Sequence, residues 1–287
     1  MLRLAVTARA ETFDRLCDPL AARGIEVGHL PAEGRTIRLD APPAEPFDVG
    51  FVFPSRTQSG DALAALHGLP WVNGRAAVLT SRNKGGVLAT LGRADLPVPK
   101  TTMVSSPVDE AALVAAVDGF DWPVVVKPNS TTRGTGVAKA TDIDSLLGVV
   151  DYLDLVHDYR ATGDKTFLLQ EYLSDARDYR VMVVDGAYAG AVERHLPAAD
   201  RDAGRWKHNV HRGAEAVGVD LPDEYRRLAE RAADTLGIDY LGVDLLVTDD
   251  RVVVAETNAR PTVDSATKYV DDFYDRLAGL IRRTAKE

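Results

Sequence analysis

Apolar and polar residues in the first part of the chain alternate in a way that predicts strands separated by helices. Short apolar runs predict strands over residues 2–7, 25–30, 48–54 and 69–73. Helical spacing of apolar residues predicts helices over residues 13–23 and 61–67. Strands that alternate with helices form a parallel sheet with helices on its faces. We therefore expect an N-terminal α/β domain, interrupted by a Pro-, Glu- and Gly-rich loop over residues 31–47.

The segment Leu96-Pro-Val-Pro-Lys100 marks the end of this domain. A helix is predicted over residues 81–91, and the two prolines after it force extended backbone. Beyond them, Ser106-Pro-Val-Asp109 is predicted to open another helix, with a capping-box pattern and Pro107 at the first helical position. We predict three units, which cover residues 1–95, 96–173 and 174–287.

The second and third units have an α+β pattern. Strands are predicted over residues 124–127, 137–140, 167–172, 179–184, 187–193, 242–247 and 252–256. Helices are predicted over residues 142–155 and 224–236, and Gly237 ends the second of them. Asp185-Gly186 is a hairpin turn signal between two of the strands.

Composition and charge exclude several classes of protein. The net charge of −9 argues against general nucleic-acid binding, which requires many basic groups at phosphates. The sequence has no apolar run of the ~20 residues that span a bilayer. Its single cysteine, Cys17, excludes an internal disulfide and a Cys-based zinc site. A cytoplasmic location is the default expectation. The bias toward Asp and Arg is typical of a high-salt cytoplasm or of a GC-rich genome, and both explanations stay open.

A lysine at the end of a buried strand is the first candidate for chemistry. Lys127 follows the apolar run of residues 124–126, where a charge is costly unless an anion accompanies it. The next residues, 129–136, form a Ser/Thr/Gly loop that includes Gly134 and Gly136. Backbone N–H groups in such a loop can bind phosphate oxygens. An ordinary exposed hairpin is the alternative interpretation. P-loop, dinucleotide, zincin and hydrolase motifs are absent from the sequence.

Three oxygen-bearing side chains converge on the last predicted hairpin. Glu256 and Asn258 are two residues apart on one strand, so they share a face, and Asp244 lies on the partner strand. Such a set suits Mg²⁺, which proteins hold with a few carboxylates and substrate phosphates. The alternative interpretation is solvated acids beside a turn, which is the expectation for Asp249 and Asp250.

A basic and amide-rich segment is the third candidate. It comprises Arg194, after Glu193, and the run Lys207-His-Asn-Val-His-Arg-Gly213. Arginine can hold a carboxylate or phosphate with two parallel hydrogen bonds. A basic surface loop is the alternative.

Taken in order, these segments resemble the ATP-grasp superfamily and, within it, the RimK-like glutamate ligases. The resemblance extends from about Asp48 to Arg260 and includes motifs outside the three clusters. These are Ser81-Arg-Asn-Lys84, Leu169-Gln-Glu-Tyr172, Asp178-Tyr-Arg180 and Gly242-Val-Asp244. Each motif alone is unspecific, but the ordered set is specific.

The resemblance implies an ATP-grasp fold, in which a parallel-sheet domain precedes two lobes that enclose ATP. It implies that Lys84 and Lys127 contact the phosphates, that Glu171 and Tyr172 form the hinge beside adenine, and that Asp178 contacts the ribose. The run Lys207, His208 and Asn209 matches residues that contact the nucleotide. The Mg²⁺ ligands would be Asp244, Glu256 and Asn258, with Mn²⁺ as an alternative ion.

The implied activity is ATP-dependent carbon–nitrogen ligation of an acid to an amino acid. ATP would phosphorylate a carboxylate, and an amine would attack the acyl-phosphate. Arg180, Arg194 and Arg212 are candidates for holding the acyl-phosphate or an amino-acid carboxylate. The acceptor stays open between a protein tail, a cofactor and a small acid, and so does a homo-oligomeric state. Neither a nucleic acid nor a membrane is an expected partner.

The sequence departs from the glutamate ligases after the last metal ligand. Those enzymes continue with Ala-Ser-Pro-Gly, whereas here Asn258 is followed by Ala-Arg-Pro-Thr262. The segment after the predicted hinge, residues 174–177, is also shorter than expected. Arg260, aimed by Pro261, would add a positive charge that favours an acidic substrate such as glutamate. Alternatively, Arg260 pairs with Asp264 and braces the loop. A ligase for an amino-acid-biosynthesis carrier protein or a small peptide, and a nucleotide-binding relative without catalysis, are the rival functions.

Overall fold

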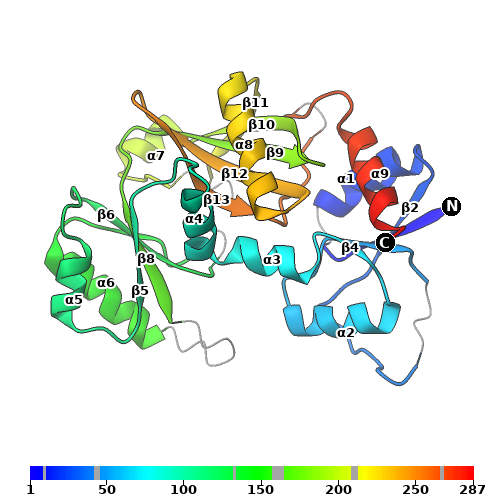
Figure 1. The fold of residues 1–287 in the computed structure, drawn as a ribbon, viewed down its shortest axis with the longest axis horizontal. Coiled ribbons are helices and arrows are strands. Elements are labelled where there is room, and N and C mark those ends of the chain that lie inside the picture. The colour runs from blue at the N-terminus through cyan, green and yellow to red at the C-terminus, as the bar shows by residue number, and fades with distance from the viewer. Residues whose placement is uncertain (9–10, 42–45, 132–133, 157–164, 208–212, 266–267) are drawn as a thin grey trace.

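The computed structural model describes residues 1–8, 11–41, 46–131, 134–156, 165–207, 213–265 and 268–287. These residues form three sheets with helices packed on them, arranged along an elongated molecule (Figure 1). In the described residues, no helix combines the length and the apolar character needed to cross a membrane.

The N-terminal sheet is parallel, as predicted. Its strands are β1 (Leu2–Val6), β2 (Ile25–His29), β3 (Val49–Phe51) and β4 (Trp71–Val72), in the order β2-β1-β3-β4. The helices α1 (Glu11–Ala21) and α2 (Thr57–His67) lie between them in sequence. β1 is the central partner, since it pairs with β2 and with β3. The carboxyl ends of these strands therefore meet at one edge of the domain.

The second sheet belongs to a small lobe and is antiparallel. It consists of β5 (Thr101–Ser105), β6 (Val124–Pro128), β7 (Ala138–Ala140) and β8 (Thr166–Glu171), in the order β5-β8-β6-β7. The helices α5 (Glu110–Ala116) and α6 (Ile143–Val156) share a buried core with it. The pairing of Lys127 with Leu168 between β6 and β8 places Lys127 in the middle of the lobe.

The third sheet has five antiparallel strands in the order β11-β10-β9-β12-β13. Their bounds are β9 (Arg177–Val184), β10 (Ala187–His195), β11 (Glu215–Val219), β12 (Tyr240–Val247) and β13 (Val252–Asn258). Asp185 and Gly186 have φ of 56° and 73°, the conformation expected of the predicted hairpin turn. The helix α8 (Asp223–Leu236) packs on one face, and α7 (Ala198–Asp202) follows β10.

Several helix predictions were wrong in their boundaries, and two of them have a clear physical reason. The helix predicted over residues 81–91 is two helices, α3 (Arg75–Arg82) and α4 (Lys84–Arg93). Asn83 separates them because its side chain accepts a hydrogen bond of 3.0 Å from the N–H of Gly86 and caps α4. The helix expected from Ser106 begins at Glu110, because Asp109 is its cap and accepts from the N–H of Ala112 at 2.8 Å.

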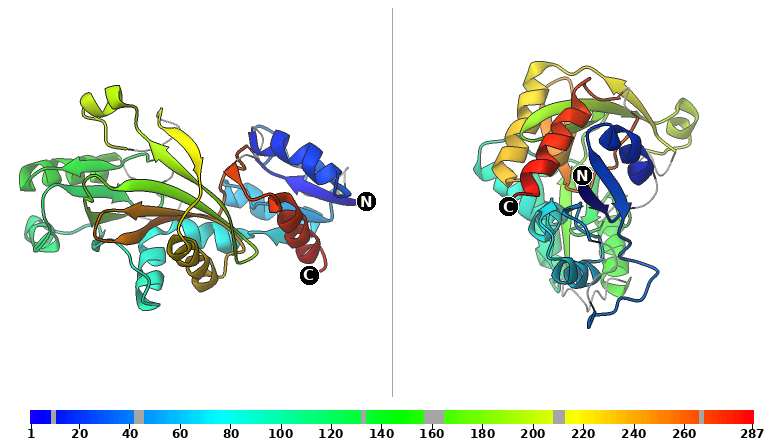
Figure 2. Two further views of the ribbon diagram at one scale, coloured as in Figure 1. Left: turned by 90° about the horizontal axis from the view of Figure 1, so that it is seen from above. Right: turned by 90° about the vertical axis from the view of Figure 1, so that its right-hand side faces the viewer.

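The C-terminal helix α9 (Phe273–Thr284) returns to the N-terminal domain, where it lies beside α1 (Figures 1 and 2). One buried core joins this helix, the parallel sheet and the third sheet. Within that core the rings of Phe51 and Tyr240 are 5.0 Å apart. The parallel sheet and the five-stranded sheet are thus packed together, whereas the small lobe has a core of its own.

Candidate functional site

Lys84 occupies the first position of α4, directly after the capping residue Asn83. Its side chain is only 5% exposed, and Nζ lies 3.3 Å from Oε1 of Glu256 at the end of β13. The same ammonium group donates a hydrogen bond to the carbonyl of Thr131, in the loop after β6. One lysine thus links the helix, the metal-ligand strand and the glycine-rich loop, which fits the phosphate contact that we predicted.

Lys127 is a second buried cation in the same region. It donates a hydrogen bond of 2.9 Å to Oε1 of Gln170 on the neighbouring strand. Burial is the largest cause that lowers the pKa of Lys127 to about 8; Glu256 and Asp244 oppose the shift, and Lys84 adds to it. These effects show that Lys127 and the carboxylates lie within each other's electrostatic range. Gln170 was not predicted as a site residue, although its polar character at a strand end was visible in the sequence.

The three predicted metal ligands lie on paired strands. Asp244 on β12 stands opposite Glu256 on β13, and Gly242 stands opposite Asn258. The register shifts directly after Asp244, so that one extra residue on β13 separates this pair from the next one. The arrangement predicted from the hairpin is therefore present, with Asp244 and Glu256 as direct partners across the ladder.

Two arginines hold the carboxylate of Asp244. Arg180 donates from Nε and one terminal nitrogen to the two oxygens of Asp244, both at 2.7 Å. A terminal nitrogen of Arg194 lies 3.0 Å from Oδ2 of Asp244, and its Nε donates to Asp178 at 3.0 Å. Burial alone would raise the pKa of Asp244, but Arg180 and Arg194 hold it at about 2. Burial would lower the pKa of Arg194, but Asp244 and Asp178 raise it above the usual range.

These contacts bear on the predicted roles of three residues. Arg180 and Arg194 each contact carboxylates of the protein itself, so their first role in this structure is to keep Asp244 ionised. Asp178 is paired with Arg194 and is also buried. The ribose contact for Asp178 and the substrate contacts for the two arginines stay predictions.

The donor set fits Mg²⁺ in its chemistry. All three side chains offer oxygen, and Asp244 is anionic at any pH above about 2. Oδ1 of Asn258 accepts from the N–H of Arg260 at 2.8 Å, which fixes the orientation of its amide. Within the described ranges, no group of three or more His, Cys, Asp or Glu could hold a metal. A metal here would rely on two carboxylates, one amide oxygen and substrate oxygens.

The predicted hinge is held by the side chain of Glu171. Its Oε1 accepts from the N–H of Lys100 at 2.7 Å, and its Oε2 from Arg251 at 2.6 Å. The ring of Tyr172 is 5.8 Å from that of Trp206, in an edge-to-face arrangement, and the ammonium of Lys139 lies 4.6 Å from the Tyr172 ring centre. Trp206 was not predicted, and its aromatic character beside Lys207 is the sequence signal that could have found it.

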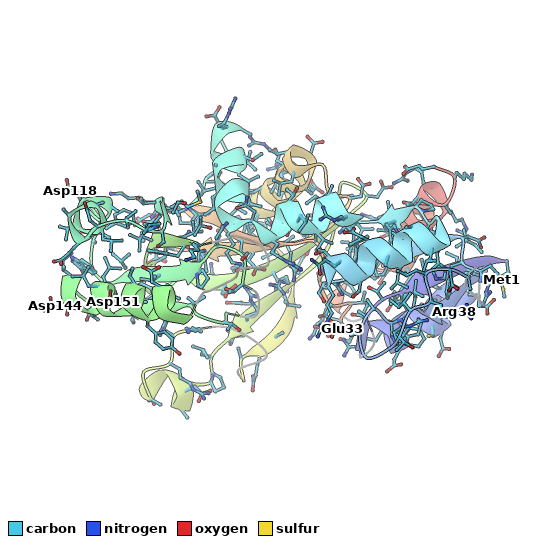
Figure 3. All side chains as sticks on the ribbon, turned by 90° about the horizontal axis from the view of Figure 1, so that it is seen from below. Met1, Glu33, Arg38, Asp118, Asp144 and Asp151 are labelled. Atoms are coloured by element: carbon cyan, nitrogen blue, oxygen red, sulfur yellow. The ribbon has the colours of Figure 1, made fainter. Side chains whose placement is uncertain are left out.

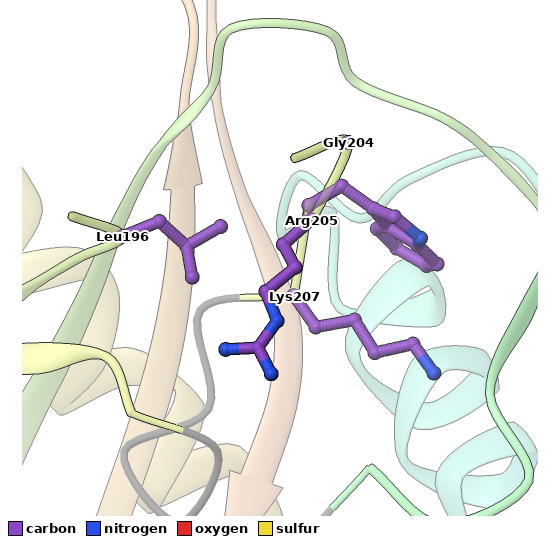
Figure 4. A pocket seen from close by; sticks show the side chains of 5 residues that line it. Leu196, Gly204, Arg205 and Lys207 are labelled. Carbon is purple, nitrogen blue, oxygen red and sulfur yellow. The ribbon is translucent and has the colours of Figure 1, made fainter. Parts of the chain in front are cut away.

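A pocket of about 350 Å³ opens next to this hinge (Figure 4). Its lining residues are Leu196, Gly204, Arg205, Trp206 and Lys207. Lys207 also donates to the carbonyl of Val137, at the end of the glycine-rich loop. In that loop Gly134 and Gly136 have φ of 65° and 74°, which favours glycine. The predicted residues His208, Asn209 and Arg212 lie outside the described residues.

Arg260 contacts the N-terminal domain. Its NH1 donates to the carbonyl of Phe53 at 2.7 Å, while Asp264 pairs with Lys268 at 2.8 Å and with Arg15 at 3.3 Å. The alternative in which Arg260 pairs with Asp264 was therefore wrong. Burial and the nearby charge of Arg82 together lower the pKa of Arg260 to about 10, against the opposing effect of Glu33.

Comparison with known proteins places this geometry in a family. The family model of the RimK-like ATP-grasp domain matches residues 81–276. A protein from Enterobacter sp. (strain 638) named probable alpha-L-glutamate ligase is 34% identical over 217 residues, which are 75% of this chain and 68% of that protein. The RimK domain ATP-grasp protein from Sphaerobacter thermophilus is 25% identical, with a TM-score of 0.67 over 99% of this chain and 100% of that one.

A more distant structure shares the fold alone. D-alanine–D-alanine ligase from Bacillus anthracis, solved with ATP, is 17% identical, with a TM-score of 0.66 over 100% of this chain and 98% of that one. The predicted fold class and the predicted resemblance are both confirmed. The chain belongs to the RimK-like ATP-grasp family.

Proposed function

We propose that this ATP-grasp ligase joins a carboxylate to an amine through an acyl-phosphate, and that it adds glutamate or a similar acidic amino acid to an acceptor. The observation that carries the proposal is the cluster of Lys84 and Lys127 around Asp244 and Glu256. Two buried cations beside two carboxylates suit a polyphosphate and its cation, and the cluster contains no nucleophile of a hydrolase. The acidic substrate is supported by the relatives named probable alpha-L-glutamate ligase.

The reaction has two steps. The substrate whose carboxylate is activated is called the donor. One of its carboxylate oxygens attacks the γ-phosphorus of ATP, the bond from that phosphorus to the bridging oxygen breaks, and ADP leaves. The amine then attacks the carbonyl carbon of the acyl-phosphate and forms a tetrahedral intermediate. Phosphate leaves with the bonding electron pair, and the amine nitrogen loses its proton to solvent. Neither step needs a nucleophilic side chain.

The residues of the chain supply position and charge. Lys84 and Lys127 would hold the phosphates, since phosphoryl transfer depends mainly on positioning and charge neutralisation. Asp244, Glu256 and Asn258 would hold Mg²⁺ or Mn²⁺, which neutralises charge that develops on the phosphate oxygens. Arg180 and Arg194 keep Asp244 ionised, and the Glu171–Lys100 contact holds the hinge backbone, which would lie beside the adenine of bound ATP.

Two rival functions remain candidates. A ligase for a carrier protein or a small peptide would use the same cluster of Lys84, Lys127, Asp244 and Glu256 but would act on another acceptor. A nucleotide-binding protein without catalysis would not need the carboxylates of Asp244 and Glu256 next to two lysines, so the cluster speaks against it. Protein tails, cofactors and small acids are all candidate acceptors, and a homo-oligomer is compatible with each.

ADP release separates these possibilities. The purified chain would be mixed with Mg-ATP and a panel of amino acids, alone and in pairs, and the products analysed by mass spectrometry. The proposal expects ADP release that depends on an acidic amino acid, together with a product that has lost one water. ADP release with neutral amino acids alone supports a rival ligase. ATP binding without ADP release under every combination supports the non-catalytic alternative.

A further inference from the structure

Two arginines from distant parts of the sequence reach the same short loop. The loop comprises residues 53–56, directly after β3. Arg82 at the end of α3 donates to the carbonyl of Ser55 at 3.1 Å, and Arg260 after β13 donates to the carbonyl of Phe53 at 2.7 Å. Because these carbonyls are two residues apart, the two guanidinium groups lie close together despite their like charge.

Neither guanidinium has a carboxylate partner in the described part of the chain. The only hydrogen bond of the Arg82 side chain there goes to the carbonyl of Ser55, and that of the Arg260 side chain goes to the carbonyl of Phe53. The charge of Glu33 acts on Arg260, but the Glu33 carboxylate is bound by Arg56 at 3.1 Å and by the hydroxyl of Ser55 at 3.4 Å. Half-buried like charges without an anion are unfavourable, so an anionic ligand would relieve the repulsion. Arg180 and Arg194 differ, since each is paired with carboxylates of the protein.

Buried hydrogen bonds hold the pair in place without any ligand. Ser81, which precedes Arg82, accepts from the N–H of Ala259 at 3.0 Å and contacts the hydroxyl of Thr257 at 3.2 Å. Asn73 donates to the carbonyl of Ala259 at 2.7 Å. The neighbours of both arginines are therefore tied to one another, and the guanidiniums are preorganised for an anion.

The Arg82–Arg260 pair lies beside the cluster of Lys84, Lys127, Asp244 and Glu256, on the side of the N-terminal domain. Arg82 is two residues from Lys84, and Arg260 is two residues from Asn258. The loop 53–56 follows the carboxyl end of β3, the edge at which parallel sheets bind ligands. Figure 3 places Glu33 on the side of the N-terminal domain that is turned toward the rest of the chain, whereas Asp118, Asp144 and Asp151 lie at the far end of the small lobe.

We propose that Arg82 and Arg260 bind the second carboxylate of a dicarboxylic donor, whose first carboxylate is phosphorylated at the cluster of Lys84 and Glu256. The inference rests on the proposed function and adds a substrate class to it. Two guanidiniums offer a fork of N–H donors that matches a carboxylate, while a monocarboxylic donor would leave both charges unpaired. The site thus selects donors by the presence of a second acidic group.

The experiment uses glutarate and butyrate as matched donors that differ in one carboxylate. Hydroxylamine serves as the amine, so that the acyl-phosphate is trapped as a hydroxamate without knowledge of the natural acceptor. Arg82→Gln and Arg260→Gln are expected to raise the KM for glutarate roughly 30-fold or more, while the KM for ATP changes less than about 2-fold. Arg260→Lys, which keeps the charge, should recover part of the loss. Arg75→Gln, in the exposed pair with Asp61 on the same helix as Arg82, is the control and should behave as wild type.

Calorimetric binding of glutarate in the presence of Mg-ADP separates this inference from the proposed function. Binding to the wild type and its loss in the Arg82→Gln, Arg260→Gln double variant support the carboxylate site, even if no hydroxamate forms and the ligase proposal fails. The carboxylate-site inference is overturned if glutarate binds equally to both proteins or does not bind to the wild type. It is also overturned if the wild type uses butyrate and glutarate equally well. Thermal melts of each variant show whether a loss reflects unfolding, and Arg260→Lys provides the second test if the double variant does not fold.

Discussion

The ammonium group of Lys84 and the carboxylate of Glu256 form an ion pair of 3.3 Å that joins the start of α4 to the end of β13. Lys84 is almost fully buried, whereas the side chain of Glu256 is 39% exposed. The lysine is therefore held by the protein, and the carboxylate keeps access to a ligand. A cation that binds Glu256 would compete with Lys84, which would then turn to the phosphates.

The first prediction concerns this carboxylate. Glu256→Gln removes the charge that would hold the cation, so kcat should fall at least about 100-fold, because loss of a catalytic metal contact costs several kcal/mol. The fold should stay intact, since Glu256 lies at a strand end and is partly exposed. ADP release and thermal melting measure the two effects. Glu224→Gln, exposed at the start of α8, is the matched control. Activity of Glu256→Gln within ~10-fold of wild type contradicts the assignment.

The second prediction concerns the pH dependence of ATP binding. Lys127 carries its charge below its pKa of about 8 and loses it above. If Lys127 holds a phosphate, the KM for ATP should rise about 10-fold from pH 7 to pH 9. Lys127→Arg stays charged, so its KM should be flat across this range. The pKa of Lys127 is about 8 in the folded protein and 10.5 in the unfolded chain. Between these pH values only the unfolded chain still binds the proton, so the free energy of unfolding should rise with pH from 8 to 10.5. A wild-type KM that does not change with pH excludes the contact.

The third prediction concerns the stability that Asp244 provides. Its pKa is lowered from 3.8 to about 2, so the ionised form stabilises the folded state by about 2 kcal/mol at neutral pH. This stability is present above about pH 4 and is lost as the pH falls toward 2. Asp244→Asn should therefore unfold more easily in urea at pH 7, and the difference from wild type should shrink below pH 4. Asp250→Asn, in the exposed turn of the same hairpin, should leave stability unchanged within ~0.5 kcal/mol.

The fourth prediction concerns the glycine-rich loop. Hydrogen exchange of the amides of Gly134, Thr135 and Gly136 should slow when Mg-ATP is added, because phosphate oxygens accept from these N–H groups. Among the described residues of this loop, the Thr131 hydroxyl donates a 2.8 Å hydrogen bond to the Thr135 carbonyl. The amide of Gly186, in a turn outside the site, is the internal reference. Unchanged exchange at saturating Mg-ATP argues against a loop that covers the phosphates.

Local patterns in the sequence predicted much of the fold. The parallel sheet followed from apolar runs separated by helical spacing, and the hairpin at Asp185-Gly186 from its turn residues. The helix α9 was missed although Phe273, Leu277, Ile281 and Thr284 recur at helical spacing and are buried. The short strand β11 was not predictable, because its exposed edge position gives no alternation of buried and exposed residues. The predicted domain limits stay predictions.

The candidate site could be predicted from the sequence only where its residues lie on one local element. Asp244, Glu256 and Asn258 could be grouped from the sequence because one hairpin carries them. The pairing of Arg180 with Asp244, 64 residues away, depends on β9 lying next to β12, and no local pattern specifies that order. Likewise, Arg82 and Arg260 meet only because Ser81 is bound to β13 and its continuation.

The core that contains Phe51 and Tyr240 also divides the site residues between two parts of the chain. The parallel sheet, α9 and the five-stranded sheet share these buried side chains and thus form one packed unit, which we call the base. This base carries Lys84, Glu256, Arg82 and Arg260. Lys127 belongs to the small lobe, whose core is separate. The small lobe meets this base at the site, where Asn129 after β6 accepts from the N–H of Gly85 at 2.8 Å. The proposed carboxylate site therefore lies wholly on the base, so changes in the small lobe should alter the phosphate contacts and leave the residues that would recognise the second acidic group unchanged.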